Sequence, residues 1–128
     1  RVLQEYLGDL PDHVEMEVVE PAPGRANLIA RLRGTDPYAP SLALVGHLDV
    51  VPADPAGWRH DPFGAEIIDG EIWGRGAVDM LNLTAAMTVA FKMLAGSTSR
   101  LPGDLVLAAT ADEEAGSRYG MGWLVEHR

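Results

Sequence analysis

The chain has 128 residues, of which 19 are acidic and 10 basic, and it carries a formal charge of −9 with no cysteine. This length predicts about one domain, and the 47% hydrophobic fraction is that of a globular core rather than a disordered acidic tail. Because the chain has no basic stripe and no cysteine, we expect no nucleic acid, no membrane and no disulfide, and a reducing, cytoplasmic location.

Strands and helices are predicted to alternate along the chain, which implies an α/β layer structure. Asp69-Gly70 between apolar residues predicts a hairpin, and Ser117 is expected to cap a last helix. The Pro- and Gly-rich loop over 51–64 is longer than most loops in a compact domain, so we expect it to have a function. Strands are predicted over 14–20, 26–32, 41–45 and 105–110, the hairpin over 65–73, and helices over 1–10, 80–95 and 117–128.

The helix over 80–95 carries its polar side chains in one stripe. Thr84, Thr88 and Lys92 repeat at i, i+4 spacing, which places them on one side of a helix. Because the other positions are mainly apolar, we expect this stripe to face solvent and most of the remaining surface to be buried.

Three polar clusters follow predicted strands or turns. They span Gly46–Asp49, Gly74–Asp79 and Asp112–Glu114. In open α/β sheets, ligands bind at the carboxyl ends of the strands, so these clusters are candidates for a common site.

His47 and Asp49 are two residues apart and project to the same side of an extended chain. A carboxylate in this position can hold the imidazole of a metal-bound histidine. The more common role for such an aspartate is to accept hydrogen bonds from backbone N–H groups in a turn. The pair alone favours the second role.

The remaining acidic residues also have two interpretations each. Asp79 directly precedes a helix, so it is either an N-cap or a carboxylate bridging two metal ions. Asp112, Glu113 and Glu114 form either a solvated turn or a partly enclosed group that needs a cation, with Glu114 binding metal and Glu113 free as a base. His60, beside Trp58, is expected to pack in its loop or face the substrate.

Together these segments resemble the M20 family of metallopeptidases and amidohydrolases. The similarity covers residues 41 to 117 through four segments in order: Gly46–Pro52, Trp58 with Asp61–Phe63, Asp69–Met80, and Thr110–Gly116. The resemblance implies an α/β fold with a mixed β-sheet flanked by helices, as in an M20-type zinc-peptidase catalytic domain.

The resemblance also implies roles for individual residues. His47 and Glu114 would each ligate a metal ion, Asp79 would bridge two, Asp49 would orient the imidazole of His47, and Glu113 would be the general base. The cofactors would be two divalent ions, typically zinc, with cobalt or manganese as substitutes. The reaction would be hydrolysis of an amide bond in a small peptide or an N-acyl amino acid.

Two departures from the family pattern matter. Leu81 and Asn82 follow Met80 where the family usually has Lys and Gly. The family's remaining acidic and histidine ligands have no counterpart, and the dimerisation domain is absent, although a homodimer of the full-length protein fits the family. We therefore expect residues 1–128 to be the amino-terminal portion of one catalytic domain, inactive in isolation. The alternatives are a non-catalytic relative, an interaction module, or a related di-zinc peptidase.

Overall fold

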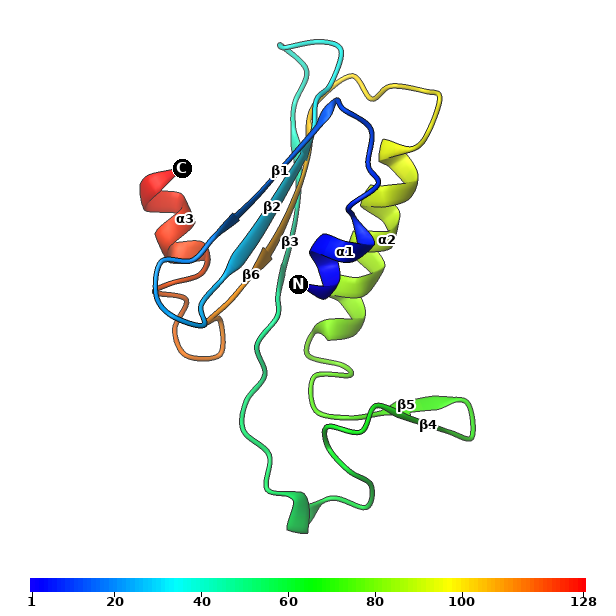
Figure 1. The fold of residues 1–128 in the computed structure, drawn as a ribbon, viewed down its shortest axis with the longest axis vertical. Coiled ribbons are helices and arrows are strands. Elements are labelled where there is room, and N and C mark those ends of the chain that lie inside the picture. Colours follow the sequence, from blue (N-terminus) through cyan, green and yellow to red (C-terminus); the bar gives the residue numbers. More distant parts are fainter.

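A computed structural model describes residues 1–128 and shows a four-stranded sheet with a separate hairpin (Figure 1). Strand order in the sheet is β1-β2-β6-β3, and the hairpin pairs β4 with β5. The strands are β1 (Val14–Val19), β2 (Asn27–Leu32), β3 (Leu42–His47), β4 (Glu66–Ile68), β5 (Glu71–Trp73) and β6 (Leu105–Thr110). The helices are α1 (Val2–Tyr6), α2 (Leu81–Ala95), α3 (Met121–His127) and a 3-10 turn over Pro55–Gly57.

The sheet is mixed, as expected from the family resemblance. β2 pairs antiparallel with β1 and β6, whereas β3 and β6 are parallel and bring His47 opposite Thr110. Figure 1 shows α1 and α2 on one side of the sheet and α3 on the other. Because β3 and β6 run in the same direction, the polar clusters that follow them meet at one edge of the sheet.

The core lies between the sheet and α2. Every second residue of β2 and β6 points into it, which is the alternation that a one-sided sheet requires. Fully burying a side chain such as Phe91 or Leu107 contributes about 1.5–3 kcal/mol. The buried cluster consists of Leu7, Leu28, Ala30, Leu32, Phe91, Ala95, Leu105, Leu107 and Ala109.

The prediction for the faces of α2 was wrong. Thr84 and Thr88 are buried against the sheet, whereas apolar residues such as Met93 are exposed. Two contacts explain this. The Thr84 hydroxyl donates to the carbonyl of His47 at 2.9 Å, and the Thr88 hydroxyl donates to the carbonyl of Thr84 at 2.7 Å. With their hydroxyls paired, threonines can be buried at little cost.

The close approach of α2 to β3 also requires a small residue on the strand. A Cβ on Gly46 would lie 2.5 Å from the Thr84 hydroxyl oxygen, so any larger residue would push the helix away. The threonine stripe and this glycine therefore fix the distance between the helix and the strand that ends at His47.

Both terminal helices are shorter than predicted. The first ends at Tyr6, whose carbonyl accepts a hydrogen bond from Lys92. The last begins at Met121 with Gly120 at its N-cap position, so the prediction that Ser117 caps this helix was wrong. Ser117 lies in the preceding turn at a φ of 59°, where its carbonyl accepts the N–H groups of Gly120 and Gly122. None of the helices has the length and hydropathy that a bilayer-spanning segment needs.

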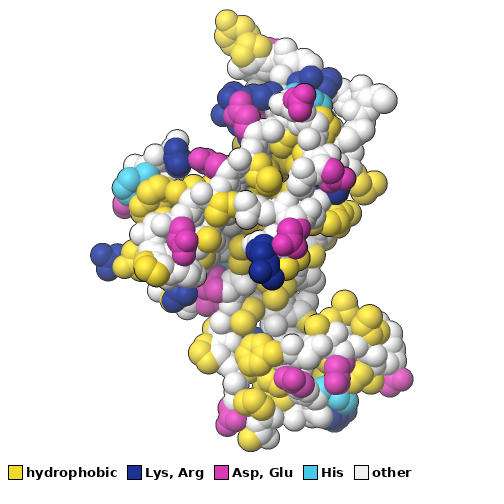
Figure 2. All heavy atoms as spheres, viewed as in Figure 1, with side chains coloured by type: hydrophobic (Ala, Val, Ile, Leu, Met, Phe, Trp, Pro, Cys, Tyr) yellow, Lys and Arg dark blue, Asp and Glu magenta, His cyan; other side chains and the backbone are white.

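Residues 48–80 form a projection from the body of the sheet and helix (Figures 1 and 2). The projection contains the long loop and the hairpin, whose turn has the predicted Asp69-Gly70 at positive φ. Its surface exposes large apolar side chains, including Phe63, Ile67 and Ile72. Unlike the sheet, this region is held mainly by turns and its own short hairpin.

Candidate metal centre

The three predicted metal ligands meet at the carboxyl edge of the parallel strands. His47 ends β3, Asp79 lies two residues before α2, and Glu114 lies in the loop after β6. One ligand atom from each of these side chains lies within 4.8 Å of the others. The fold therefore brings together three residues, each of which is 32 or more positions along the chain from the next.

His47 is held in one orientation. Its ring is 5% exposed, and its Nδ1 lies 2.9 Å from the backbone carbonyl of Asp49. Because a carbonyl only accepts, Nδ1 carries the proton and donates to it, which leaves Nε2 as the free nitrogen of a neutral ring. That Nε2 lies 3.2 Å from Asp79 Oδ1 and 3.7 Å from Glu113 Oε2.

These neighbours act on the pKa of His47 in opposite directions. Burial lowers the pKa, but the hydrogen bond to the Asp49 carbonyl, the contact with Asp79 and the charges of Glu113 and Asp49 outweigh it and raise the pKa above 6.5. The site therefore favours a positive charge at this position, which either a proton or a metal ion can supply.

Asp49 contacts both His47 and the acidic cluster. Its backbone carbonyl orients the imidazole, while its carboxylate lies 3.7 Å from Nδ1. The carboxylate instead accepts the backbone N–H groups of Glu113 and Glu114, at 3.1 and 3.0 Å. The interpretation of Asp49 as an acceptor for backbone donors in a turn is thus confirmed, and those donors belong to the acidic cluster itself.

Asp79 does not cap the helix that follows it. The N-cap position is Met80, without a side-chain hydrogen bond, and the Asp79–Met80 peptide bond is cis. The Asp79 side chain is 78% exposed and contacts only His47. Its carboxylate therefore retains lone pairs for a ligand.

The three residues of the acidic cluster have different surroundings. Asp112 is buried and forms an ion pair with Arg25, whose Nε lies 3.1 Å from Asp112 Oδ1. Glu113 is half-exposed and faces His47, with no lysine or arginine beside it. The predicted repulsion among three carboxylates is thus relieved at Asp112 by Arg25, and Glu113 and Glu114 are left to face the centre.

Sequence analysis missed Arg25 and Asn27. Asn27 is fully buried and hydrogen-bonds to Ala111 and Tyr119, at the two ends of the loop that carries the acidic cluster. The only signal in the sequence is that Arg25 and Asn27 flank the start of a predicted strand. Their role depends on β2 pairing with β6, which periodicity does not reveal.

The long loop packs against the hairpin next to the centre. His60 lies edge-on to Trp73, with ring centroids 4.7 Å apart, and 3.7 Å from Glu66. These contacts give His60 a loop-packing role. Arg75 lies over the Trp58 ring at 5.0 Å.

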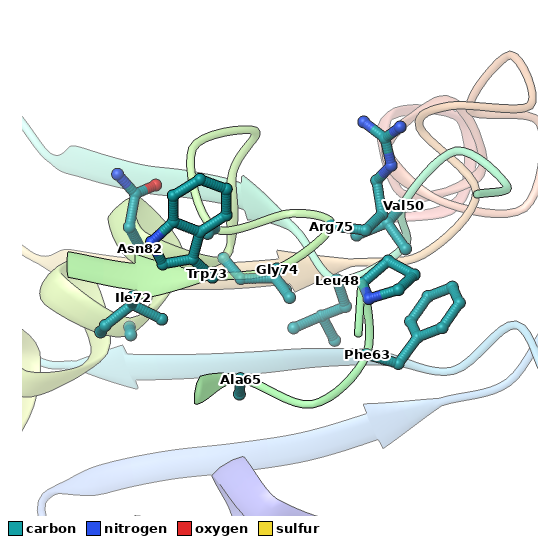
Figure 3. Close-up of a pocket in the computed structure, with 13 residues that line it drawn as sticks. Leu48, Val50, Phe63, Ala65, Ile72, Trp73, Gly74, Arg75 and Asn82 are labelled. Carbon is teal, nitrogen blue, oxygen red and sulfur yellow. The ribbon is translucent and has the colours of Figure 1, made fainter. Parts of the chain in front are cut away.

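A mainly apolar pocket of about 410 Å³ lies beneath these contacts. Figure 3 shows Trp73, Ile72 and Phe63 from the projection around it, with Leu48 and Val50 from the segment that follows β3. Leu48 and Val50 flank Asp49 and directly follow His47, so the pocket adjoins the centre. Its mainly apolar lining offers no metal ligand.

The residues of the centre fit a divalent metal ion. Zinc accepts imidazole nitrogen and carboxylate oxygen at about 2.0–2.2 Å, so neighbouring ligands in a tetrahedral shell lie about 3.3 Å apart. The 3.2 Å between His47 Nε2 and Asp79 Oδ1 agrees with that spacing. A neutral His47 with an unprotonated Nε2 would face Asp79 as one acceptor facing another, and either a second proton on the ring or a bound cation converts this contact into an attraction.

Comparison with known families agrees with this geometry. A family model described as peptidase family M20/M25/M40 matches residues 43–128, and the chain belongs to this family. A succinyl-diaminopimelate desuccinylase of Xanthomonas campestris pv. campestris (strain B100) is 43% identical over 84 residues, which are 65% of this chain and 22% of that protein. The corresponding enzyme of Acidiphilium cryptum (strain JF-5) is 43% identical over 102 residues, 80% of this chain and 26% of that protein.

Two solved structures share the fold. Human carnosine dipeptidase 1 superposes with a TM-score of 0.67 at 30% identity, covering 98% of this chain and 27% of the dipeptidase. The dipeptidase Dug1p of Saccharomyces cerevisiae gives a TM-score of 0.62 at 26% identity, covering 97% of this chain and 28% of Dug1p. The chain thus spans about a quarter of the length of the relatives it matches.

Proposed function

We propose that the protein containing this chain is a metal-dependent hydrolase of an amide bond, in a short peptide or an N-acyl amino acid. The convergence of His47, Asp79 and Glu114 within 4.8 Å carries the proposal. The relatives support the substrate class, since their names describe a desuccinylase and two dipeptidases.

In this proposal His47 and Glu114 would each hold one divalent ion, most simply zinc, and Asp79 would be shared by the two ions. Zinc lowers the pKa of a bound water to about 7 and polarises a carbonyl group. The chain's own contribution is orientation: Asp49 fixes the tautomer of His47 through its carbonyl and holds the backbone of Glu114 through its carboxylate.

Glu113 is proposed as the general base and acid. Its carboxylate lies at the centre, 3.7 Å from His47 Nε2, and has no lysine or arginine partner. It would take a proton from water as the water oxygen bonds to the carbonyl carbon. It would then give that proton to the leaving nitrogen as the C–N bond breaks.

The test is Glu113→Gln in the complete protein. The variant should lose turnover by roughly 10²–10⁴-fold, the usual contribution of a general base, while retaining its metal. Glu126→Gln, an exposed change on α3, is the matched control and should leave turnover unchanged. Full activity of Glu113→Gln would refute the base assignment.

A non-catalytic relative is the second outcome of the same experiment. It would be favoured if the wild-type complete protein, loaded with zinc, cobalt or manganese, failed to hydrolyse dipeptides, N-acetyl amino acids and N-succinyl amino acids. Glu113 has no lysine or arginine partner, and this argues for the enzyme, because a binding module has no use for a base beside the proposed metal ligands.

We also propose that residues 1–128 are the amino-terminal portion of one catalytic domain and are inactive alone. Three ligands cannot complete two coordination shells, since even a single catalytic zinc takes three protein ligands. Zinc titration calorimetry of the 128-residue chain should show weak binding or none. Two tight sites would overturn this proposal.

A further inference from the structure

The loop after β6 is closed at its neck by one buried side chain. We call residues 111–120 the acidic loop. Asn27, which is 0% exposed, donates from Nδ2 to the carbonyl of Tyr119 at 2.8 Å. Its Oδ1 accepts the N–H of Ala111 at 2.9 Å. One side chain on β2 thus bridges the start and the end of the loop that carries Glu113 and Glu114.

Arg25 acts two residues earlier on the same segment. It pairs with the carboxylate of Asp112, and that carboxylate also accepts the N–H of Tyr119 at 3.1 Å. Asp112 has a φ of 68°, a conformation that costs free energy for a residue other than glycine. The contacts of the buried carboxylate therefore hold the backbone turn immediately before Glu113.

The interior of the loop leaves little freedom. The N–H of Ser117 donates to the carbonyl of Asp112 at 2.6 Å, and the Cα of Gly120 packs so closely that an added Cβ would lie 1.9 Å from the Ala111 carbonyl oxygen. Asp49 holds the tip through the N–H groups of Glu113 and Glu114. The neck contacts from β2 and the tip contacts from Asp49 come from opposite sides.

We propose that Asn27 and Arg25 are positioning residues of the metal centre: they fix the neck of the acidic loop and so aim Glu113 and Glu114 at His47. This inference rests on the function proposed above. Asn27 hydrogen-bonds only to the two ends of the loop. Arg25 lines a small cavity with Asp49 and Glu114, but its ion pair is with Asp112, so both residues act through the loop. Changing such a supporting partner typically costs roughly 10–100-fold in metal affinity or activity.

A purely structural role would give a different result. If Asn27 only stabilised the fold, any variant of equal stability would bind metal equally well. Leu32→Ala is the control for this, because Leu32 is buried on the same strand but at the opposite end, paired with Leu105. It should lower the melting temperature without changing metal affinity.

The experiment compares wild type, Asn27→Ala and Leu32→Ala in the complete protein. Zinc affinity is measured by calorimetry, and kcat and KM are measured with the best substrate. Asn27→Ala should raise the zinc dissociation constant by roughly tenfold or more and lower kcat with little change in KM. Wild-type affinity and kcat in this variant would overturn the proposal.

Hydrogen exchange of the metal-free protein provides a readout that does not depend on the proposed function. The Glu113 and Glu114 amides should exchange roughly tenfold faster in Asn27→Ala than in wild type, because the variant loses both hydrogen bonds of Asn27. Unchanged exchange there would overturn the proposal even if the protein binds no metal. Faster exchange in a protein without metal-dependent activity would support the positioning role and refute only the proposed function.

Arg25→Gln covers the case in which Asn27→Ala does not fold. Arg25 is about half-exposed, so its replacement is compatible with folding, yet it removes the partner of Asp112. This variant should raise the zinc dissociation constant severalfold and speed exchange of the Glu113 amide. A variant that matches wild type in both measurements would contradict the proposal.

Discussion

The two loops that supply the carboxylates of the centre are built differently. The acidic loop is tied to Asn27, the first residue of β2, to Arg25 just before that strand, and to Asp49 just after β3. The second loop, residues 74–80, carries Asp79, whose carboxylate is 78% exposed and contacts only His47. This second loop belongs to the projection, and its backbone is tied to the rest of the projection by the N–H of Arg75, which donates to the carbonyl of Pro62 at 2.7 Å.

This difference suggests which part of the centre exists before metal arrives. His47, Glu113 and Glu114 are held by hydrogen bonds that do not involve a cation, so their positions are set by the fold. Asp79 has only the charge of His47 to attract it. We therefore expect a bound ion to order the Asp79 side of the centre and to change the acidic loop very little.

The largest expected effect is from Gly120→Ala, which attacks the neck of the acidic loop. The new Cβ would lie 1.9 Å from the Ala111 carbonyl oxygen, so the loop must move. We expect a loss of about 3 kcal/mol in the free energy of unfolding, at the upper end for overpacking, and loss of zinc binding. Gly57→Ala is the control, since a Cβ there meets nothing within 4 Å. A Gly120→Ala variant as stable as wild type would contradict the close packing described for Gly120 and Ala111.

The second prediction compares Asp49→Ala with Asp79→Ala in the metal-free protein. Asp49→Ala removes the acceptor of two backbone N–H groups and should cost about 1.5–3 kcal/mol, as for hydrogen bonds to a charged group. Asp79→Ala should change stability by about 0.5 kcal/mol or less, as for an exposed side chain. Urea unfolding measures both. Equal losses would mean that the two loops are equally pre-formed.

The smallest expected effect is the pH dependence contributed by His47. Because the fold raises the pKa of His47, the folded metal-free protein binds this proton more tightly than the unfolded chain. The resulting stabilisation is complete below the unfolded pKa of about 6.5 and is lost as the pH rises through the higher folded pKa. His47→Gln should therefore flatten the decline in urea midpoint as the pH rises above about 6.5. An identical slope in variant and wild type would contradict the described surroundings of His47.

Much of the fold follows from local patterns in the sequence. The strand over 105–110 and the hairpin at Asp69-Gly70 were predicted from alternation and turn chemistry, and the structure confirms them. The wrong predictions depend on partners far along the chain. Thr84 is buried because it reaches a carbonyl 37 residues away, and periodicity alone treats a threonine as polar.

The candidate site shows the same division. The clusters that contain His47, Asp79 and Glu114 could be selected because polar clusters that follow strands or turns of an α/β sheet meet at one edge. The roles of these three residues as metal ligands came from the resemblance to the M20 family. Asn27 could not be selected, because its partners lie 84 and 92 residues away and its value depends on the strand order β2-β6. Candidate metal ligands can be predicted from the sequence because few residue types bind metal ions. Residues that position the loop carrying the ligands can be identified only from the folded structure.

Crystals of the complete protein grown with zinc and measured at the zinc absorption edge test the central claim most directly. We predict anomalous density about 2.0–2.2 Å from His47 Nε2 and from carboxylate oxygens of Asp79 and Glu114, with the acidic loop placed as in the metal-free protein. Density elsewhere, or none between these three side chains at saturating zinc, would contradict the assignment of a metal centre to this edge of the sheet.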